Sequence, residues 1–182
     1  RNLPVVFVVA GMGLADAIDL LGAGGGIADA DLGFRLAIGL VAVLISLIGG
    51  RIIPSFTRNW LAQRRVTEGL PVQPTRFDLA TVLASAAALA AWALHPEGRV
   101  VGVALAIVGI LQLVRLSRWA GWRTLSEPIV WILHLGYAWI GIGVALLGAS
   151  CLTEAVPRSA AIHALTAGAA GTMILAVMTR AT

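Results

Sequence analysis

Two histidines lie within long apolar stretches of the chain, where every polar group is costly. His134 stands in the segment WILHLGYAW and His163 in the segment AAIHALT. A neutral imidazole nitrogen in such surroundings can ligate haem iron or copper. The alternative is a hydrogen bond to a neighbouring helix, and the sequence leaves both interpretations open. Tyr137 follows His134 by three residues, so we expect the two side chains on one helix face.

The depths of the two histidines predict that they do not ligate the same iron. At about 1.5 Å of rise per residue, His134 is roughly 10 Å from one end of its apolar stretch, and His163 is roughly 25 Å from the matching end of its own. The resulting offset of about 15 Å exceeds the separation of about 4 Å that two axial nitrogens on one iron require. We therefore expect them to act at separate positions.

Several charged residues lie in or beside the apolar stretches. Arg51 follows Gly49-Gly50, where a guanidinium is suited to hold a propionate or a phosphate, although an anchor at the membrane surface is the simpler interpretation. Arg115 is expected to snorkel, with its head group at the membrane surface. Asp16 and Asp19 suit proton or ion transfer, or a helix that ends early. The sequence contains no phosphate-binding loop, cysteine pair or catalytic triad, so it defines no reaction.

Six apolar segments are long enough to position these residues in a bilayer, which a helix spans with about 20 residues. They are residues 3–21, 33–50, 77–94, 100–116, 128–150 and 159–178. None alternates with a period of two, and each spanning segment must satisfy its own backbone hydrogen bonds, so we expect helices. The composition agrees, because 59% of the residues are hydrophobic and 12% are charged. We predict an all-α, polytopic transmembrane bundle that forms a single domain over residues 1–182.

The segment 51–76 is predicted to be a basic loop after a second helix that Gly49-Gly50 closes. An amphipathic helix at the membrane surface over residues 52–67 is the alternative. Ten of the thirteen arginines lie on the face that carries this loop, so the positive-inside rule places that face, and both ends of the chain, in the cytoplasm. Arginines in short runs between apolar segments also argue against nucleic-acid binding.

The ends of the chain suggest a piece of a longer membrane protein. It begins on Arg1 rather than Met, and it stops at Thr182 directly after an apolar stretch. The sequence specifies no oligomeric state. Its single cysteine, Cys151, excludes an intrachain disulfide.

Four motifs between residues 49 and 182 resemble signatures of the NnrS family. They are GGRIIPSFTRNW at residues 49–60, RWAGWRTLSEP at residues 118–128, HLGYAW at residues 134–139, and HALTAGAAGTM with MTRAT at residues 163–173 and 178–182. Residues 1–48 match the family only in character.

The resemblance implies a haem- and copper-containing protein of the bacterial inner membrane that is linked to nitric oxide and nitrosative stress. It favours His134 and His163 as haem or copper ligands, and Tyr137 and Arg51 are the further candidates for cofactor binding. It also implies that this chain is the C-terminal half, whose partners are the lipid bilayer and the missing N-terminal half.

The sequence leaves two other functions open. One is a transporter or exporter of a small solute, with Asp16, Asp19 and Arg51 on its pathway. The other is a structural or sensor subunit of the membrane without chemistry of its own.

Overall fold

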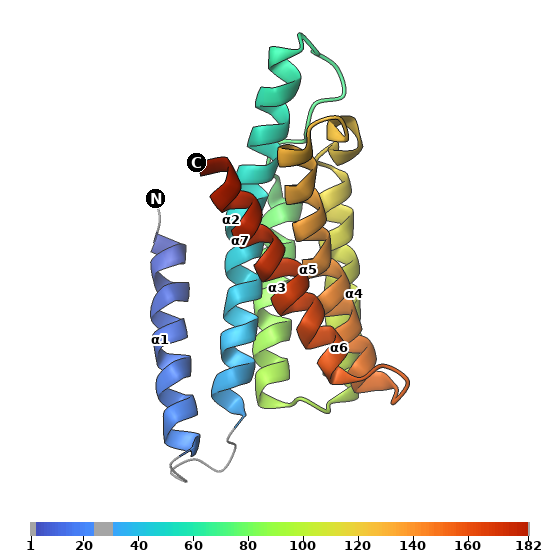
Figure 1. Cartoon of the computed structure of the whole chain (residues 1–182). Coiled ribbons are helices and arrows are strands. Elements are labelled where there is room, and N and C mark those ends of the chain that lie inside the picture. Colours follow the sequence, from blue (N-terminus) through green and yellow to red (C-terminus); the bar gives the residue numbers. More distant parts are fainter. Residues whose placement is uncertain (1–2, 24–30, 182) are drawn as a thin grey trace.

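The computed structural model describes residues 3–23 and 31–181, and these residues form a bundle of helices (Figure 1). The elements are α1 (Leu3–Ala23), α2 (Leu32–Gln63), α3 (Arg76–Leu94), α4 (Arg99–Ser117), η1 (Gly121–Thr124), α5 (Pro128–Leu152), α6 (Arg158–His163), η2 (Ala164–Gly171) and α7 (Thr172–Ala181). The last three follow one another directly and form one spanning element. Six helical elements are long and apolar enough to cross a membrane, which confirms the predicted fold. Arg1 and Thr182 lie outside the described residues.

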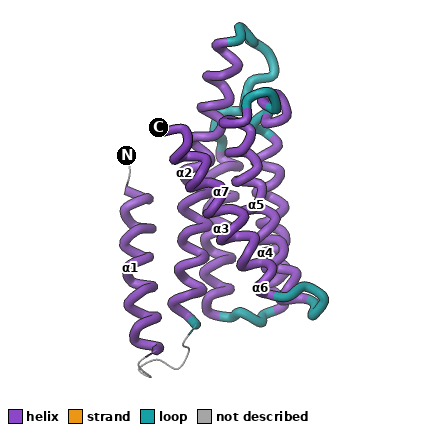
Figure 2. Tube along the Cα trace, viewed as in Figure 1, coloured by secondary structure: helices purple, strands orange, loops and turns teal. Residues whose placement is uncertain are grey.

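Four of the spanning helices, α2 to α5, pack side by side, and the last spanning element crosses them at an angle (Figure 1). The first helix, α1, lies beside α2 at the edge of the bundle, and most of its side chains are exposed. Figure 2 shows that the described loops gather at the two ends of the bundle. Large side chains such as Trp92, Leu105 and Leu147 fill the core and are fully buried.

Glycines bring α4 and α5 into close contact at two levels. Gly109 of α4 faces Gly141 of α5, and Gly102 of α4 faces Gly148 of α5. The two pairs are seven residues apart on each helix, and their order shows that the helices are antiparallel. A Cβ atom on Gly109 would lie 2.5 Å from the backbone nitrogen of Ala145. Real Cβ contacts are not this short, so the two backbones can approach only because these positions lack side chains.

Helix α2 differs from the prediction because it does not end at Gly49-Gly50. It continues through Pro54 to Gln63, so residues 51–63 are neither a loop nor a separate surface helix. The two glycines are buried and serve packing instead. A Cβ atom on Gly49 would lie 3.0 Å from the Tyr137 ring, and one on Gly50 would overlap the Arg115 guanidinium. Glycine is common at helix ends, but here the close packing of Tyr137 and Arg115 against the two glycines stabilises a continuous helix.

The loop between α2 and α3 is held against the rest of the bundle by arginine side chains. Arg58 donates a hydrogen bond to the carbonyl oxygen of Pro71 at 2.7 Å, and Arg123 donates to the carbonyl oxygens of Glu68 and Gly69. Two of the arginines near this loop therefore donate hydrogen bonds to its backbone carbonyls.

Candidate functional site

A cluster of polar side chains lies buried where α2, α3, α4 and α5 meet. We call it the Arg115 network, and its members are Ser46, Asp78, Ser85, Gln112, Arg115 and Tyr137. Arg115 Nε donates to Asp78 Oδ1 at 3.1 Å, and its Nη1 donates to the Tyr137 hydroxyl at 2.8 Å. The same Nη1 lies 3.1 Å and 3.0 Å from the carbonyl and hydroxyl oxygens of Ser46. One guanidinium thus links all four helices.

The neutral members of the Arg115 network also bond to one another. The Tyr137 hydroxyl donates to Gln112 Oε1 at 2.6 Å. Gln112 Nε2 donates to the hydroxyls of Ser46 and Ser85 at 2.9 Å and 2.8 Å. Ser85 in turn donates to the carbonyl oxygen of Thr81 at 2.7 Å. Such mutual satisfaction is what makes burial of polar groups tolerable in a low dielectric.

The prediction that Arg115 snorkels to the membrane surface is wrong. Its residue exposure is 4%, and it pairs with Asp78, which is 6% exposed. Asp78 is fixed by a capping box, because the backbone nitrogen and the hydroxyl of Thr75 donate to Asp78 Oδ2 at 2.8 Å and 2.9 Å. Arg118 Nη1 lies 3.4 Å from the same oxygen. The arginine stays inside because a positioned carboxylate compensates its charge there.

His134 is buried, and neighbouring residues contact its ring. Its Nδ1 lies 3.1 Å from the carbonyl oxygen of Val130, and its Nε2 lies 3.3 Å from the Thr57 hydroxyl. With the proton on Nδ1, Nε2 accepts from that hydroxyl. A Cβ atom on Gly121 would lie 2.5 Å from the ring carbon Cδ2. His134 therefore ties α2, η1 and α5 together, and both of its nitrogens are engaged.

His163 has the opposite character, because its side chain is exposed on the outside of the bundle. Its Nδ1 lies 2.8 Å from the carbonyl oxygen of Ser159, which assigns the proton to Nδ1 and leaves a lone pair on Nε2. Within the described part of the chain, Nε2 has no hydrogen-bond partner. An imidazole held in this way is the usual form of a metal-ligating histidine.

The helix changes its winding directly after His163. Residues Ala164–Gly171 form a π-helical segment, a rare form that occurs often at functional sites. This segment packs closely on α5, since a Cβ atom on Gly168 would lie 2.8 Å from the Trp139 ring. The small residues here let the wide π turns approach the indole while His163 remains on the outer surface.

The structure places the predicted cofactor-binding residues in four different surroundings. His134 is buried under α2 and η1, Tyr137 belongs to the Arg115 network, His163 is exposed on α6, and Arg51 is exposed on α2. The two histidines thus lie in different surroundings, one buried and one exposed. Asp16 and Asp19 are exposed on α1. The three charges assigned to a transport pathway therefore share no buried site.

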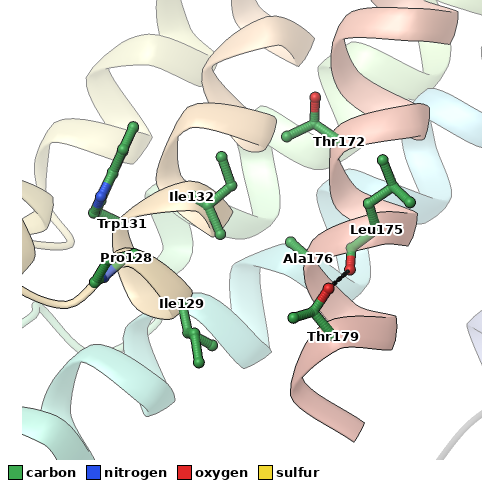
Figure 3. A pocket seen from close by; sticks show the side chains of 8 residues that line it. All are labelled: Pro128, Ile129, Trp131, Ile132, Thr172, Leu175, Ala176 and Thr179. Atoms are coloured by element: carbon green, nitrogen blue, oxygen red, sulfur yellow. Dashed lines mark hydrogen bonds between the residues drawn. The ribbon is translucent and has the colours of Figure 1, made fainter. Parts of the chain in front are cut away.

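A groove of about 460 Å³ lies between parts of α5 and α7, and Figure 3 shows the side chains that line it. They are Pro128, Ile129, Trp131, Ile132, Thr172, Leu175, Ala176 and Thr179. The Thr179 hydroxyl donates to the carbonyl oxygen of Leu175 at 2.8 Å, so it faces its own helix (Figure 3). The groove is of ligand size, but it offers a metal no histidine.

The donor atoms of the described residues fit a haem or copper ion in part. Within residues 3–23 and 31–181, no three side chains of His, Cys, Asp or Glu come together as a ligand set. His134 does not fit, because Thr57 and Val130 occupy its nitrogens. His163 fits as a single ligand with an outward nitrogen. The described residues therefore place no set of three such ligands around His163.

Sequence reasoning missed Asp78, Ser46 and Ser85 as members of the buried cluster. One signal was present, because Thr75 and Asp78 have the spacing of a capping box at the start of a helix. Gln112 and Arg115 are three residues apart and hence on one helix face. The two serines carry no comparable signal, since a hydroxyl in an apolar helix usually bonds its own backbone.

Comparison with known proteins gives one family. A family model described as "NnrS protein" matches residues 1–182, which is the whole chain and includes the first 48 residues. No curated protein and no solved structure matches the chain.

Proposed function

Because this chain belongs to the NnrS family, we propose that it is a membrane-embedded haem and copper protein of the response to nitric oxide and nitrosative stress. It is a multi-pass helical membrane protein, as its six long apolar elements show. The proposal places it in the inner membrane of a bacterium, with the arginine-rich face and both ends in the cytoplasm.

The observation that carries the cofactor assignment is the outward Nε2 of His163. The carbonyl oxygen of Ser159 holds the other ring nitrogen at 2.8 Å, so the imidazole is oriented and its tautomer is fixed before any metal arrives. A bound haem or copper would supply a metal centre that accepts nitric oxide. The contribution of this chain is one preorganised nitrogen ligand on a membrane-spanning element.

The remaining ligands would come from the rest of the full-length protein. His163 faces away from the bundle, so a second helix that brings a ligand would have to pack against α6 from outside. In this proposal His134 and Tyr137 support the site indirectly, because they hold α5 against α2 and α4.

The proposal predicts the optical spectrum of the full-length protein purified from its membrane. We expect a Soret band, a shift of that band when nitric oxide is added to the reduced protein, and copper in elemental analysis. The same preparation denatured before reconstitution with haem serves as the control for adventitious haem. A well-folded protein that is colourless and free of copper would refute the cofactor assignment while leaving the family and the fold untouched.

A further inference from the structure

A second groove, of about 320 Å³, lies between α2 and α7 on the side of α7 opposite to the groove of Figure 3. Its walls are apolar side chains. They include Leu44, Ile48 and Ile52 of α2 and Ile174, Val177 and Met178 of α7. The α7 residues are open to the surroundings, with 58% of Ile174 and 62% of Met178 exposed. The groove therefore opens outward along a membrane-spanning surface.

Arg51 lies on α2 directly before Ile52, which lines this groove. It follows Ile48 by three residues and Leu44 by seven, so the three side chains form one stripe along α2. The arginine is exposed and makes no hydrogen bond or ion pair with the residues that the structure describes. Arg51 is thus a positive charge close to an apolar groove, and the described residues provide it with no partner.

The length of α2 fixes the depth of Arg51. The helix has 32 residues, which correspond to about 48 Å, whereas the hydrocarbon core is about 30 Å thick. Arg51 is 19 residues beyond Leu32, or about 28 Å along the axis. If Leu32 lies at one boundary of the hydrocarbon, Arg51 lies at the other, at the level of the phosphates. The groove then lies just inside the leaflet on the arginine-rich face.

We propose that this groove holds one acyl chain of an anionic phospholipid whose phosphate pairs with Arg51. A guanidinium binds phosphate bidentately, and the apolar walls accept a hydrocarbon chain but offer nothing to a polar molecule. A protein helix that filled the groove with apolar side chains would leave Arg51 without a counter-charge. A lipid supplies a phosphate for Arg51 and a hydrocarbon chain for the apolar walls. Its binding does not depend on whether His163 binds a cofactor.

Native mass spectrometry of the full-length protein tests this site with phosphatidylglycerol and phosphatidylcholine added in equal amounts. Arg51→Gln should weaken phosphatidylglycerol binding about fivefold and leave phosphatidylcholine unchanged, since one pairing of an arginine with an anionic lipid contributes about that factor. Arg76→Gln is the matched control and should change neither affinity, because Arg76 is exposed on the same face but lies on α3, which contributes no residue to the groove. Equal phosphatidylglycerol binding by Arg51→Gln and the unaltered protein would overturn the proposal.

A photo-reactive benzophenone amino acid at Val177 identifies the occupant directly. Irradiation in native membranes should attach a phospholipid to the protein and leave its mobility on a gel nearly unchanged. A cross-link to another part of the same protein, or to a second copy, would overturn the proposal in favour of a helix in the groove.

Discussion

The variant Asp78→Ala is expected to lower the free energy of unfolding of the full-length protein by about 3–5 kcal/mol. It removes the carboxylate that faces Arg115 at 3.1 Å, in a place where the two side chains are only 8% and 5% exposed. An unpaired guanidinium would then remain among four packed helices. Thermal unfolding in detergent and the yield of monodisperse protein measure the effect, which should be severe in both.

The control for this variant is Glu97→Ala, which removes an acid from the pair with Arg158. That pair has a separation of 4.0 Å, and the Glu97 side chain is 87% exposed, so the loss should be small. A double variant, Asp78→Leu with Arg115→Met, removes both charges and should recover most of the lost yield. Equal stability of Asp78→Ala and Glu97→Ala would show that the buried pair does not hold the helices together.

The variant Gly109→Ala is expected to destabilise the bundle although it adds a single carbon atom. The new Cβ atom would lie 2.5 Å from the backbone nitrogen of Ala145 and 2.7 Å from the carbonyl oxygen of Gly141. Neither is the end of a flexible side chain, so the backbones of α4 and α5 must shift apart at this level. Overpacking of this kind costs about 1–3 kcal/mol, and backbone contacts lie at the upper end.

Gly13→Ala is the matched control for Gly109→Ala. Gly13 also lies in a spanning helix, but a Cβ atom there would meet nothing within 4 Å. Alanine is the better helix former, so this variant should unfold at the same temperature as the parent or slightly above it. Identical melting temperatures for the two variants would contradict the close α4–α5 contact.

The sequence was sufficient to predict six spanning helices, because length and apolarity are local properties of each segment. It was insufficient at Gly49-Gly50, where a pattern typical of a helix end lies inside α2. Whether a glycine pair ends a helix depends on what packs against it, and here that is Tyr137 and Arg115 from two other helices. The same dependence explains Arg115, since the compensating Asp78 is 37 residues away in the sequence.

The candidate site shows the same division between local and distant information. The sequence identified both histidines, because an imidazole in an apolar segment is conspicuous. It could not separate their roles, since Thr57, which engages His134, is 77 residues away. The carbonyl that orients His163 is only four residues away, and both histidines share this local contact. The two histidines differ at Nε2, which contacts Thr57 in His134 and is exposed in His163.

The content of haem iron and copper per folded protein, measured in His163→Ala and His134→Ala of the full-length protein, tests the central claim most directly. His95→Ala serves as the control, because His95 is exposed at the end of α3. We predict that His163→Ala loses one of the two metals and keeps a normal yield. We also predict that His134→Ala keeps both metals in a smaller folded fraction. Full metal content in His163→Ala would contradict the assignment of His163 as a ligand.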